Sequence, residues 1–199
     1  MHRDDTALTL GEARRMYFAR NHFGPEGGYG EAWVKFKVGP FPVAFPNTPG
    51  RVRAVRFHDL HHVVTGYPTT LQGEGQIGAW EIATGCADHW AAWGLNLTAM
   101  TFGLLLAPRA VFRAFVRGRH SRNLYRETFS DTLLGRTVGA TRADLGLDAA
   151  DVSPNAADIA AFGAWCLVGM VGGGTALALG AVPLGLAMAL TAANTARPT

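Results

Sequence analysis

Apolar and polar residues recur at helical spacing along most of this chain. Asn47-Thr48-Pro49 marks a helix start, because a capping residue followed by proline is typical of an N-terminus. This helix should run to about Val64 and end at Thr65-Gly66-Tyr67-Pro68. Thr69 or Thr70 then caps a second helix. Its predicted range is Leu71 to Thr84, with Gly85 as the terminator, and further helices are predicted over 8–21, 87–106, 109–116, 123–134 and 141–147.

The segment from Phe23 to Gly50 interrupts this pattern. It is dense in glycine and proline, including Gly24-Pro25 and Gly39-Pro40, and is expected to be irregular. Within it, Ala32 to Val38 resembles a short strand. No segment shows sustained alternation of apolar and polar positions, so the predicted fold class is all-α.

Two runs of the chain contain no charged residue. One covers Trp90 to Pro108, and the other covers the 38 residues from Ile159 to Ala196. The second run exceeds the roughly 20 residues that a membrane-spanning helix needs. Ser153-Pro154-Asn155 marks a boundary before it, which divides the chain into a helical domain over 1–150 and an apolar tail over 155–195. The tail is predicted to be a membrane anchor, and a buried core helix is the alternative.

Composition supports a folded protein with an unusual excess of apolar residues. Of 199 residues, 48% are hydrophobic and 17% are charged, and the mean hydropathy is +0.09. The charged fraction lies below the ~25% of an ordinary soluble domain, which excludes global disorder. The two cysteines, Cys86 and Cys166, show no metal-binding spacing and are too few for a disulfide scaffold, so they are expected to be free thiols.

Positive charge gathers in one stretch of the chain. Six arginines fall between Arg109 and Arg126, and Arg109, Arg113 and Arg117 are spaced four residues apart on one helix face beside Phe112. This pattern suits an anionic membrane surface or an isoprenoid phosphate. A solvated helix face is the alternative. Nucleic acid is not predicted as a partner, because the patch is small and no recognition fold is apparent.

The segment His58-Asp59-Leu60-His61-His62 carries the clearest candidate chemistry. At about 100° per residue, His58, Asp59 and His62 share one arc of the helix that Pro49 opens. Histidines at i and i+4 present two imidazoles to one metal ion, and Asp59 would either ligate it or orient an imidazole. Glu74, near the start of the following helix, would reach the same ion across the helix hairpin. This donor set suits zinc, iron or manganese.

Glu81 lies seven residues after Glu74 and returns to the same face of its helix. It is therefore a candidate catalytic base or a residue that orients a ligand; an exposed helical glutamate is the alternative. His61 lies on the flank of the arc and is expected to be a neighbour of the metal site rather than a ligand.

These motifs resemble one known family. His58-Asp59-x-x-His62, followed by eleven residues and Glu74, is similar to the H-D-x-x-H…E zinc motif of the coenzyme Q biosynthesis protein four family. Thr65-Gly66-Tyr67 resembles that family's turn between its ligand helices, and Ala79-Trp80-Glu81 resembles the continuation. The similarity covers roughly residues 10–148 and is weaker from Arg117 onward.

The resemblance implies an all-helical ubiquinone biosynthesis protein at a membrane surface, here on the cytoplasmic face. It implies zinc held by His58, Asp59, His62 and Glu74, and a role in oxidative decarboxylation at C1 of a polyprenylated benzoate ring. Implied partners are a prenylated quinone precursor or another isoprenoid lipid, together with other quinone-biosynthesis enzymes. The long apolar tail departs from the family's usual pattern.

Two other functions remain open at this point. A non-catalytic isoprenoid- or quinone-binding scaffold would use the metal only for structure. A membrane hydroxylase would use His58-x-x-His61-His62 as a histidine box, although the sequence contains only seven histidines and no second box. No flavin or nicotinamide motif is present, so an oxidative reaction would need a redox-active metal or oxygen attack on an activated ring.

Overall fold

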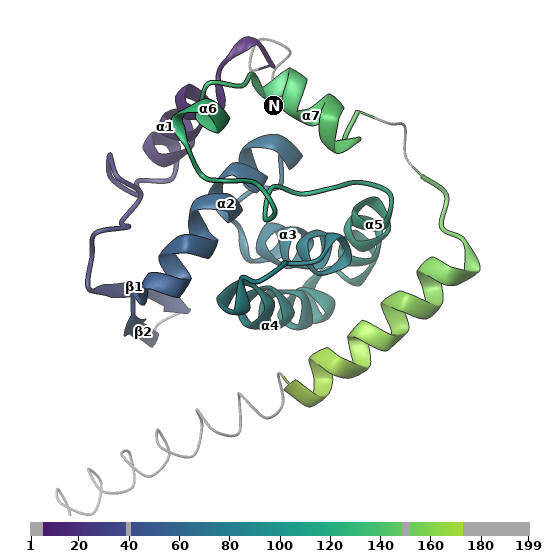
Figure 1. Ribbon diagram of the computed structural model, residues 1–199. Helices are drawn as coiled ribbons and strands as arrows, with labels where there is room; N and C mark the ends of the chain where they lie inside the picture. Colours follow the sequence, from purple (N-terminus) through teal and green to yellow (C-terminus); the bar gives the residue numbers. More distant parts are fainter. Residues whose placement is uncertain (1–5, 39–40, 149–151, 173–199) are drawn as a thin grey trace, which may run out of the picture.

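The structure, a computed structural model, describes residues 6–38, 41–148 and 152–172 (Figure 1). Most of these residues are helical, which confirms the predicted helical character, and one two-stranded β-hairpin is added to it. The named helices are α1 (Leu10–Arg20), α2 (Pro49–Thr65), α3 (Leu71–Thr84), α4 (Trp90–Leu106), α5 (Pro108–Arg119), α6 (Asp131–Leu134) and α7 (Val138–Leu145). A further helix covers residues 156–172.

Threonine side chains begin several of these helices. Thr9, Thr48, Thr70 and Thr137 each accept a backbone N–H from the first turn of the helix they precede. The predicted starts of α2 and α3 are confirmed, as are their ends at Thr65 and Thr84. Local capping therefore sets the length of the two helices that carry the candidate metal ligands.

Helix α3 lies at the centre of the molecule and packs mainly against α4 and α5 (Figure 1). Glycines allow this close approach, because a Cβ atom built on Gly75 would lie 2.5 Å from the Cα atom of Gly103. Trp80 of α3 is completely buried in the same core, as are Leu60 of α2 and Phe115 of α5. In Figure 1, α2 crosses beside this group, with α1, α6 and α7 above it.

The predicted strand-like piece is confirmed as strand β1 (Trp33–Val38), but its partner β2 (Phe41–Pro46) was not predicted. The strands pair antiparallel, from Trp33 opposite Pro46 to Val38 opposite Phe41. Prolines at both ends of β2 hid it, because proline within an apolar run argues against a strand. An isolated hairpin of this kind tolerates proline because both of its strands are edge strands.

The helix predicted over 123–134 is wrong over most of its length, since only Asp131–Leu134 is helical. The backbone before it is held by one tertiary and one local hydrogen bond instead. The N–H of Leu124 donates to Nε2 of His61 at 3.0 Å, and the N–H of Tyr125 donates to the Asn123 side chain at 3.0 Å. These contacts override local helix propensity.

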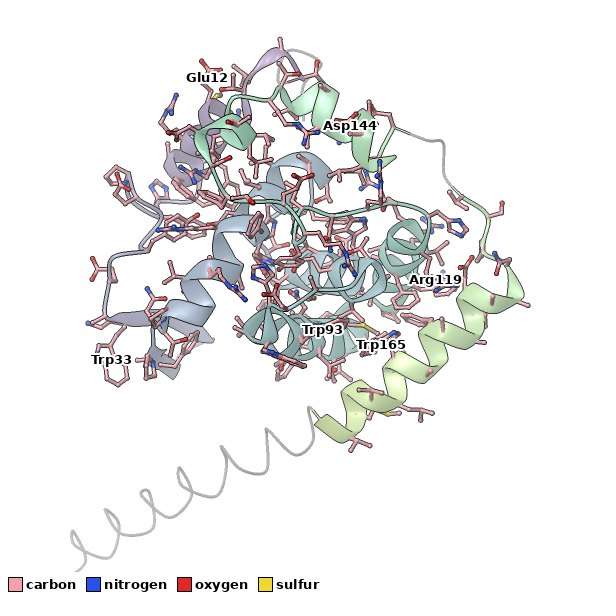
Figure 2. The ribbon with its side chains drawn as sticks, viewed as in Figure 1. Glu12, Trp33, Trp93, Arg119, Asp144 and Trp165 are labelled. Atoms are coloured by element: carbon pink, nitrogen blue, oxygen red, sulfur yellow. The ribbon has the colours of Figure 1, made fainter. Side chains whose placement is uncertain are left out.

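The helix over 156–172 begins with Asn155 and Asp158, each of which accepts the other's backbone N–H. It packs across α4 and α5: Phe162 meets Phe115 edge-on, and Trp165 stacks on Trp93 at 5.5 Å between ring centroids (Figure 2). The rest of the predicted apolar tail, from residue 173, lies outside the described residues. Among the helices that are described, none combines the length and apolar character needed to span a bilayer.

Candidate metal centre

Helix α2 presents two imidazoles on one face. His58 and His62 are one helical turn apart, and their ring centroids are separated by 4.7 Å. Gly66 ends the helix directly after them in the left-handed conformation, with φ of 78°. The chain can then reverse at once, which brings the next helix back to the histidines.

The turn into α3 depends on one glycine. A Cβ atom on Gly73 would lie 1.9 Å from the carbonyl oxygen of Pro68, so any larger residue would force the turn open. Thr70 caps α3, and the N–H of Glu74 donates to the Thr70 carbonyl at 2.8 Å. This tight connection directs Glu74 toward the histidines of α2.

His58, His62 and Glu74 bring three donor atoms together. The two Nε2 atoms are 3.1 Å apart, and each lies 3.4 Å from an oxygen of the Glu74 carboxylate. Atoms bound at ~2.0–2.1 Å around a tetrahedral zinc ion lie roughly 3.3 Å from one another. The spacing therefore fits a single small cation, and two of the sequence-predicted ligands on α2 do meet Glu74 of α3.

The hydrogen bonds of the imidazoles fix their tautomers. His58 Nδ1 lies 2.9 Å from a Glu81 oxygen, and His62 Nδ1 lies 2.8 Å from the Tyr67 carbonyl. Both partners can only accept, so both Nδ1 atoms carry hydrogen. Both Nε2 lone pairs then face each other and the Glu74 carboxylate. Such an arrangement requires a positive charge between them. Metal-bound histidines are commonly oriented in the same way, by a hydrogen bond from the ring nitrogen that does not bind the metal.

The cluster has an accessible side. The side chain of His62 is buried, but those of His58 and Glu74 remain 19% and 34% exposed. Three protein ligands with an open side are typical of catalytic zinc centres, whereas structural zinc is usually enclosed by four. Two histidines and one carboxylate are also the ligand set of non-haem iron oxygenases.

Glu81, predicted as a catalytic residue, lies behind His58 and is completely buried. One carboxylate oxygen accepts from His58 and His61, the latter at 2.7 Å. The other accepts from the Tyr125 hydroxyl at 2.5 Å and from the Asn96 amide. Both oxygens are thus fully engaged, so Glu81 is placed to orient His58 rather than to meet a substrate.

The charges of the cluster are strongly coupled. Burial alone would lower the pKa of His58, but the carboxylates of Glu81 and Glu74 raise it well above its usual range. Burial would raise the pKa of Glu74, yet hydrogen bonding to His58 and His62 lowers it to about 2. The pKa of Glu81 is also held far below its usual range, against burial, by His58 and His61. Without a metal, a proton on the histidine pair supplies the positive charge.

Asp59, the fourth predicted ligand, lies outside this three-residue cluster. It is buried, and its Oδ2 accepts from the Tyr29 hydroxyl at 2.6 Å. Burial raises the pKa of Asp59, although this hydrogen bond and the neighbouring histidines oppose the shift. The Tyr17 ring stacks on His62 at 5.4 Å and shields it. In this arrangement Asp59 lies beside the cluster and is not one of its three ligand residues.

The three predicted lipid-binding arginines differ in exposure, because two are exposed to solvent and one is half-buried. Arg109 and Arg113 are exposed on α5. Arg117 is half-buried, donates to the carbonyls of Thr65 at 3.1 Å and Leu147 at 3.3 Å, and lies over the Tyr67 ring. Arg117 therefore supports the turn that follows α2, which leaves the first two arginines available to a partner.

Sequence reasoning missed several residues around the cluster. His61 was expected only as a neighbour, and it shares the Glu81 oxygen with His58 while its Nε2 accepts from the Leu124 N–H. Asn96 and Tyr125 reach Glu81 from α4 and from the segment after α5, and no spacing signal in the sequence links them to it.

Comparison with known proteins gives no further assignment: no family model, curated protein or solved structure matches this chain.

Proposed function

We propose that the protein is a membrane-associated, metal-dependent enzyme of ubiquinone biosynthesis that acts on a prenylated aromatic acid. The observation that carries the proposal is the cluster in which His58 Nε2 and His62 Nε2 lie 3.1 Å apart and each lies 3.4 Å from a different oxygen of the Glu74 carboxylate. The substrate class and the choice of zinc come from the sequence resemblance, with iron and manganese as alternatives. C1 oxidative decarboxylation is the reaction that the resemblance implies.

The residues of the cluster fit a divalent cation. His58, His62 and Glu74 would hold it, while Glu81 and the Tyr67 carbonyl keep the two imidazoles in the ligating tautomer. A bound divalent metal supplies Lewis-acid stabilisation of a phenolate or carboxylate on the substrate ring. The exposed edges of His58 and Glu74 mark the side from which such a ring would approach.

A scaffold with a structural metal is the second candidate. The complete burial of Glu81 and His61 favours it, since a metal beside this network would stabilise the core. The two functions differ in what Glu74 does. In an enzyme, Glu74→Ala abolishes turnover while the protein stays folded; in a scaffold, stability and metal are lost together.

The decisive experiment combines elemental analysis of the native protein with mass spectrometry of its copurifying lipids. We expect about one divalent metal per chain and an isoprenoid compound. Glu74→Ala should lose the metal, whereas Glu127→Ala, which removes an exposed carboxylate that is not part of the cluster, should keep it. Native protein that contains neither metal nor isoprenoid would refute the proposed function.

Membrane association is supported by one apolar face. On α4, Leu105 is 79% exposed; on the helix over 156–172, Val171 is 73% exposed. Gly169 lies against Thr101 of α4, so the two helices adjoin there. With the exposed Arg109 and Arg113 of α5 nearby in sequence, the face suits an anionic bilayer surface.

Vesicle flotation tests this surface. Leu105→Glu should weaken binding to vesicles that contain anionic lipid, because a charge on the apolar face resists burial in the interface. Met16→Glu makes the same kind of change on α1, which lies away from α4 (Figure 1), and should leave flotation unchanged. Equal flotation of both variants and the wild type would argue against this docking face.

A further inference from the structure

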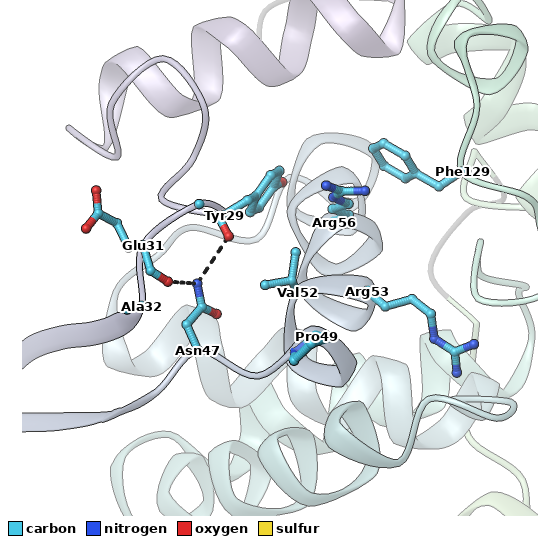
Figure 3. Close-up of a pocket in the computed structure, with 10 residues that line it drawn as sticks. Tyr29, Glu31, Ala32, Asn47, Pro49, Val52, Arg53, Arg56 and Phe129 are labelled. Carbon is cyan, nitrogen blue, oxygen red and sulfur yellow. Dashed lines mark hydrogen bonds between the residues drawn. The ribbon is translucent and has the colours of Figure 1, made fainter.

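A cavity of about 460 Å³ opens beside the first turns of α2 (Figure 3). Its walls come from the segment before β1, from α2 and from the segment before α6. The residues that matter most are Tyr29, Ala32, Asn47, Val52, Arg56 and Phe129. None of them belongs to the three-residue metal cluster.

Arg56 is held in this cavity by two aromatic rings. Its guanidinium carbon lies 5.4 Å from the centre of the Tyr29 ring and 5.6 Å from that of Phe129. Cation–π contacts of this kind fix a guanidinium without neutralising it. Arg56 is exposed, and within the part of the chain that is described no carboxylate lies within ion-pair distance of it. A fixed and accessible guanidinium can form charge-assisted hydrogen bonds to a carboxylate or phosphate group.

The other polar groups of the cavity are already engaged. The Asn47 amide donates to the carbonyl of Glu31 at 2.8 Å, and its oxygen accepts from Arg51 at 2.7 Å. Arg53 pairs with Asp88 at 3.1 Å and points away from the Tyr29 side of the cavity (Figure 3). The Glu31 carboxylate likewise points outward in Figure 3. Arg56 is therefore the main free donor.

The remaining walls are apolar, because they consist of Ala32, Pro49, Val52 and the two rings. We propose that this cavity binds a small organic anion, which has one carboxylate or phosphate group on a flat apolar body. Arg56 pairs with the anionic group, and Tyr29 and Phe129 contact the body. The arrangement combines a dominant apolar lining with one charged group that sets orientation, as ligand pockets do.

One hydrogen bond connects the wall of the cavity to the neighbourhood of the metal cluster. Tyr29, which lines the cavity, donates its hydroxyl hydrogen to Asp59, the residue after His58 in sequence. The anion site nevertheless uses different residues, so its test is separate from the test of the metal. Binding is expected to persist after treatment with a chelator.

Calorimetric titration of the full-length protein tests the proposal, with benzoate, phenyl phosphate, benzamide and inorganic phosphate as probes. We expect benzoate or phenyl phosphate to bind, and the tighter of the two identifies the anionic group. Neutral benzamide should bind at least about tenfold more weakly, since a hydrogen bond to a charged partner is lost. Inorganic phosphate that binds as tightly as phenyl phosphate would refute the role of the rings.

Variants complete the test. Arg56→Gln should weaken binding of the preferred probe by about 10-fold or more, whereas Arg113→Gln, which removes an exposed arginine of α5, should not change it. Ala32→Phe, which fills the cavity from its exposed wall, should abolish binding while the circular dichroism spectrum stays unchanged. Unchanged affinity in both Arg56→Gln and Ala32→Phe overturns the proposal, as does the absence of binding by either anionic aromatic probe.

Discussion

Replacement of Glu81 by glutamine is the most informative single change to the candidate metal centre. The carboxylate accepts four hydrogen bonds in a completely buried position, from His58, His61, Asn96 and Tyr125. Glu81→Gln keeps the shape of the side chain but converts one oxygen into a donor. Asn96 can turn its amide oxygen toward this new donor, so the histidines still face an acceptor.

The expected size of the effect follows from these contacts. A hydrogen bond to a charged group is worth about 1.5–3 kcal/mol and a neutral one about 0.5–1.5 kcal/mol. Losing the charge at four bonds thus costs about 4 kcal/mol, and relief of the desolvation of a buried carboxylate offsets part of this. We expect a net loss of about 2 kcal/mol in the free energy of unfolding of the metal-free protein. Affinity for zinc should fall about 10- to 100-fold, as for other partners that orient a metal-bound histidine.

Two measurements test this expectation. Chemical denaturation reports the free energy of unfolding, and competition with a chromophoric chelator reports the zinc affinity. Glu127→Gln is the matched control, because Glu127 is exposed and its nearest cation, Arg136, is 3.9 Å away. A folded Glu81→Gln variant that binds zinc as tightly as the wild type would refute the argument that the negative charge of Glu81 supports His58 as a metal ligand.

Four further outcomes are expected. Burial opposes the charge of His58, but the neighbouring carboxylates raise its pKa, so zinc should displace about one proton on binding. At pH values below that pKa, zinc affinity should therefore increase about tenfold for each unit by which the pH is raised. Calorimetry in buffers of different ionisation enthalpy that detects no proton release would contradict this. Protonated His58 also stabilises the metal-free fold below pH ~6.5, and this contribution is lost as pH rises through the folded-state pKa. Gly103→Ala should destabilise the protein by about 1–3 kcal/mol, because the added methyl group meets Gly75. Gly94→Ala, in the same helix, places its methyl group in open space and should stabilise the protein by up to about 1 kcal/mol. Equal melting temperatures of the two variants would disprove the packing argument. Thr70→Ala should cost about 1 kcal/mol by uncapping α3 and should weaken zinc binding, and unfolding and chelator assays that show neither change would exclude this role of the cap.

Sequence reasoning located the helices of the cluster because their signals are local. Thr48 with Pro49 begins α2, Thr70 begins α3, and Gly66 and Gly85 end them, so both helices were placed almost to the residue. Helical periodicity then put His58 and His62 on one face. The ligand geometry could be predicted because each step depends on residues close in sequence.

Other features depend on distant residues and could not be predicted in this way. Asp59 lies on the predicted arc, but its partner Tyr29 comes from the irregular segment 30 residues earlier. The surroundings of Glu81 are set by Asn96 and Tyr125, which tertiary packing brings in. Strand β2 was missed because its prolines oppose a strand locally, whereas its pairing with β1 favours one.

The polar side chains that connect α2 to α3 determine how rigidly these two helices are held together. α3 packs mainly against α4 and α5, so its link to α2 depends heavily on polar side chains: His58 and His62 contact Glu74, and His58 and His61 contact Glu81. A metal bound here would add a direct cross-link between α2 and α3, beyond the apolar core that they share. Amide hydrogens of α2 should then exchange more slowly when zinc is present, while those at the centre of α3, already enclosed by α4 and α5, should change less. The same site that is proposed to activate a substrate would thereby set the stiffness of the molecule.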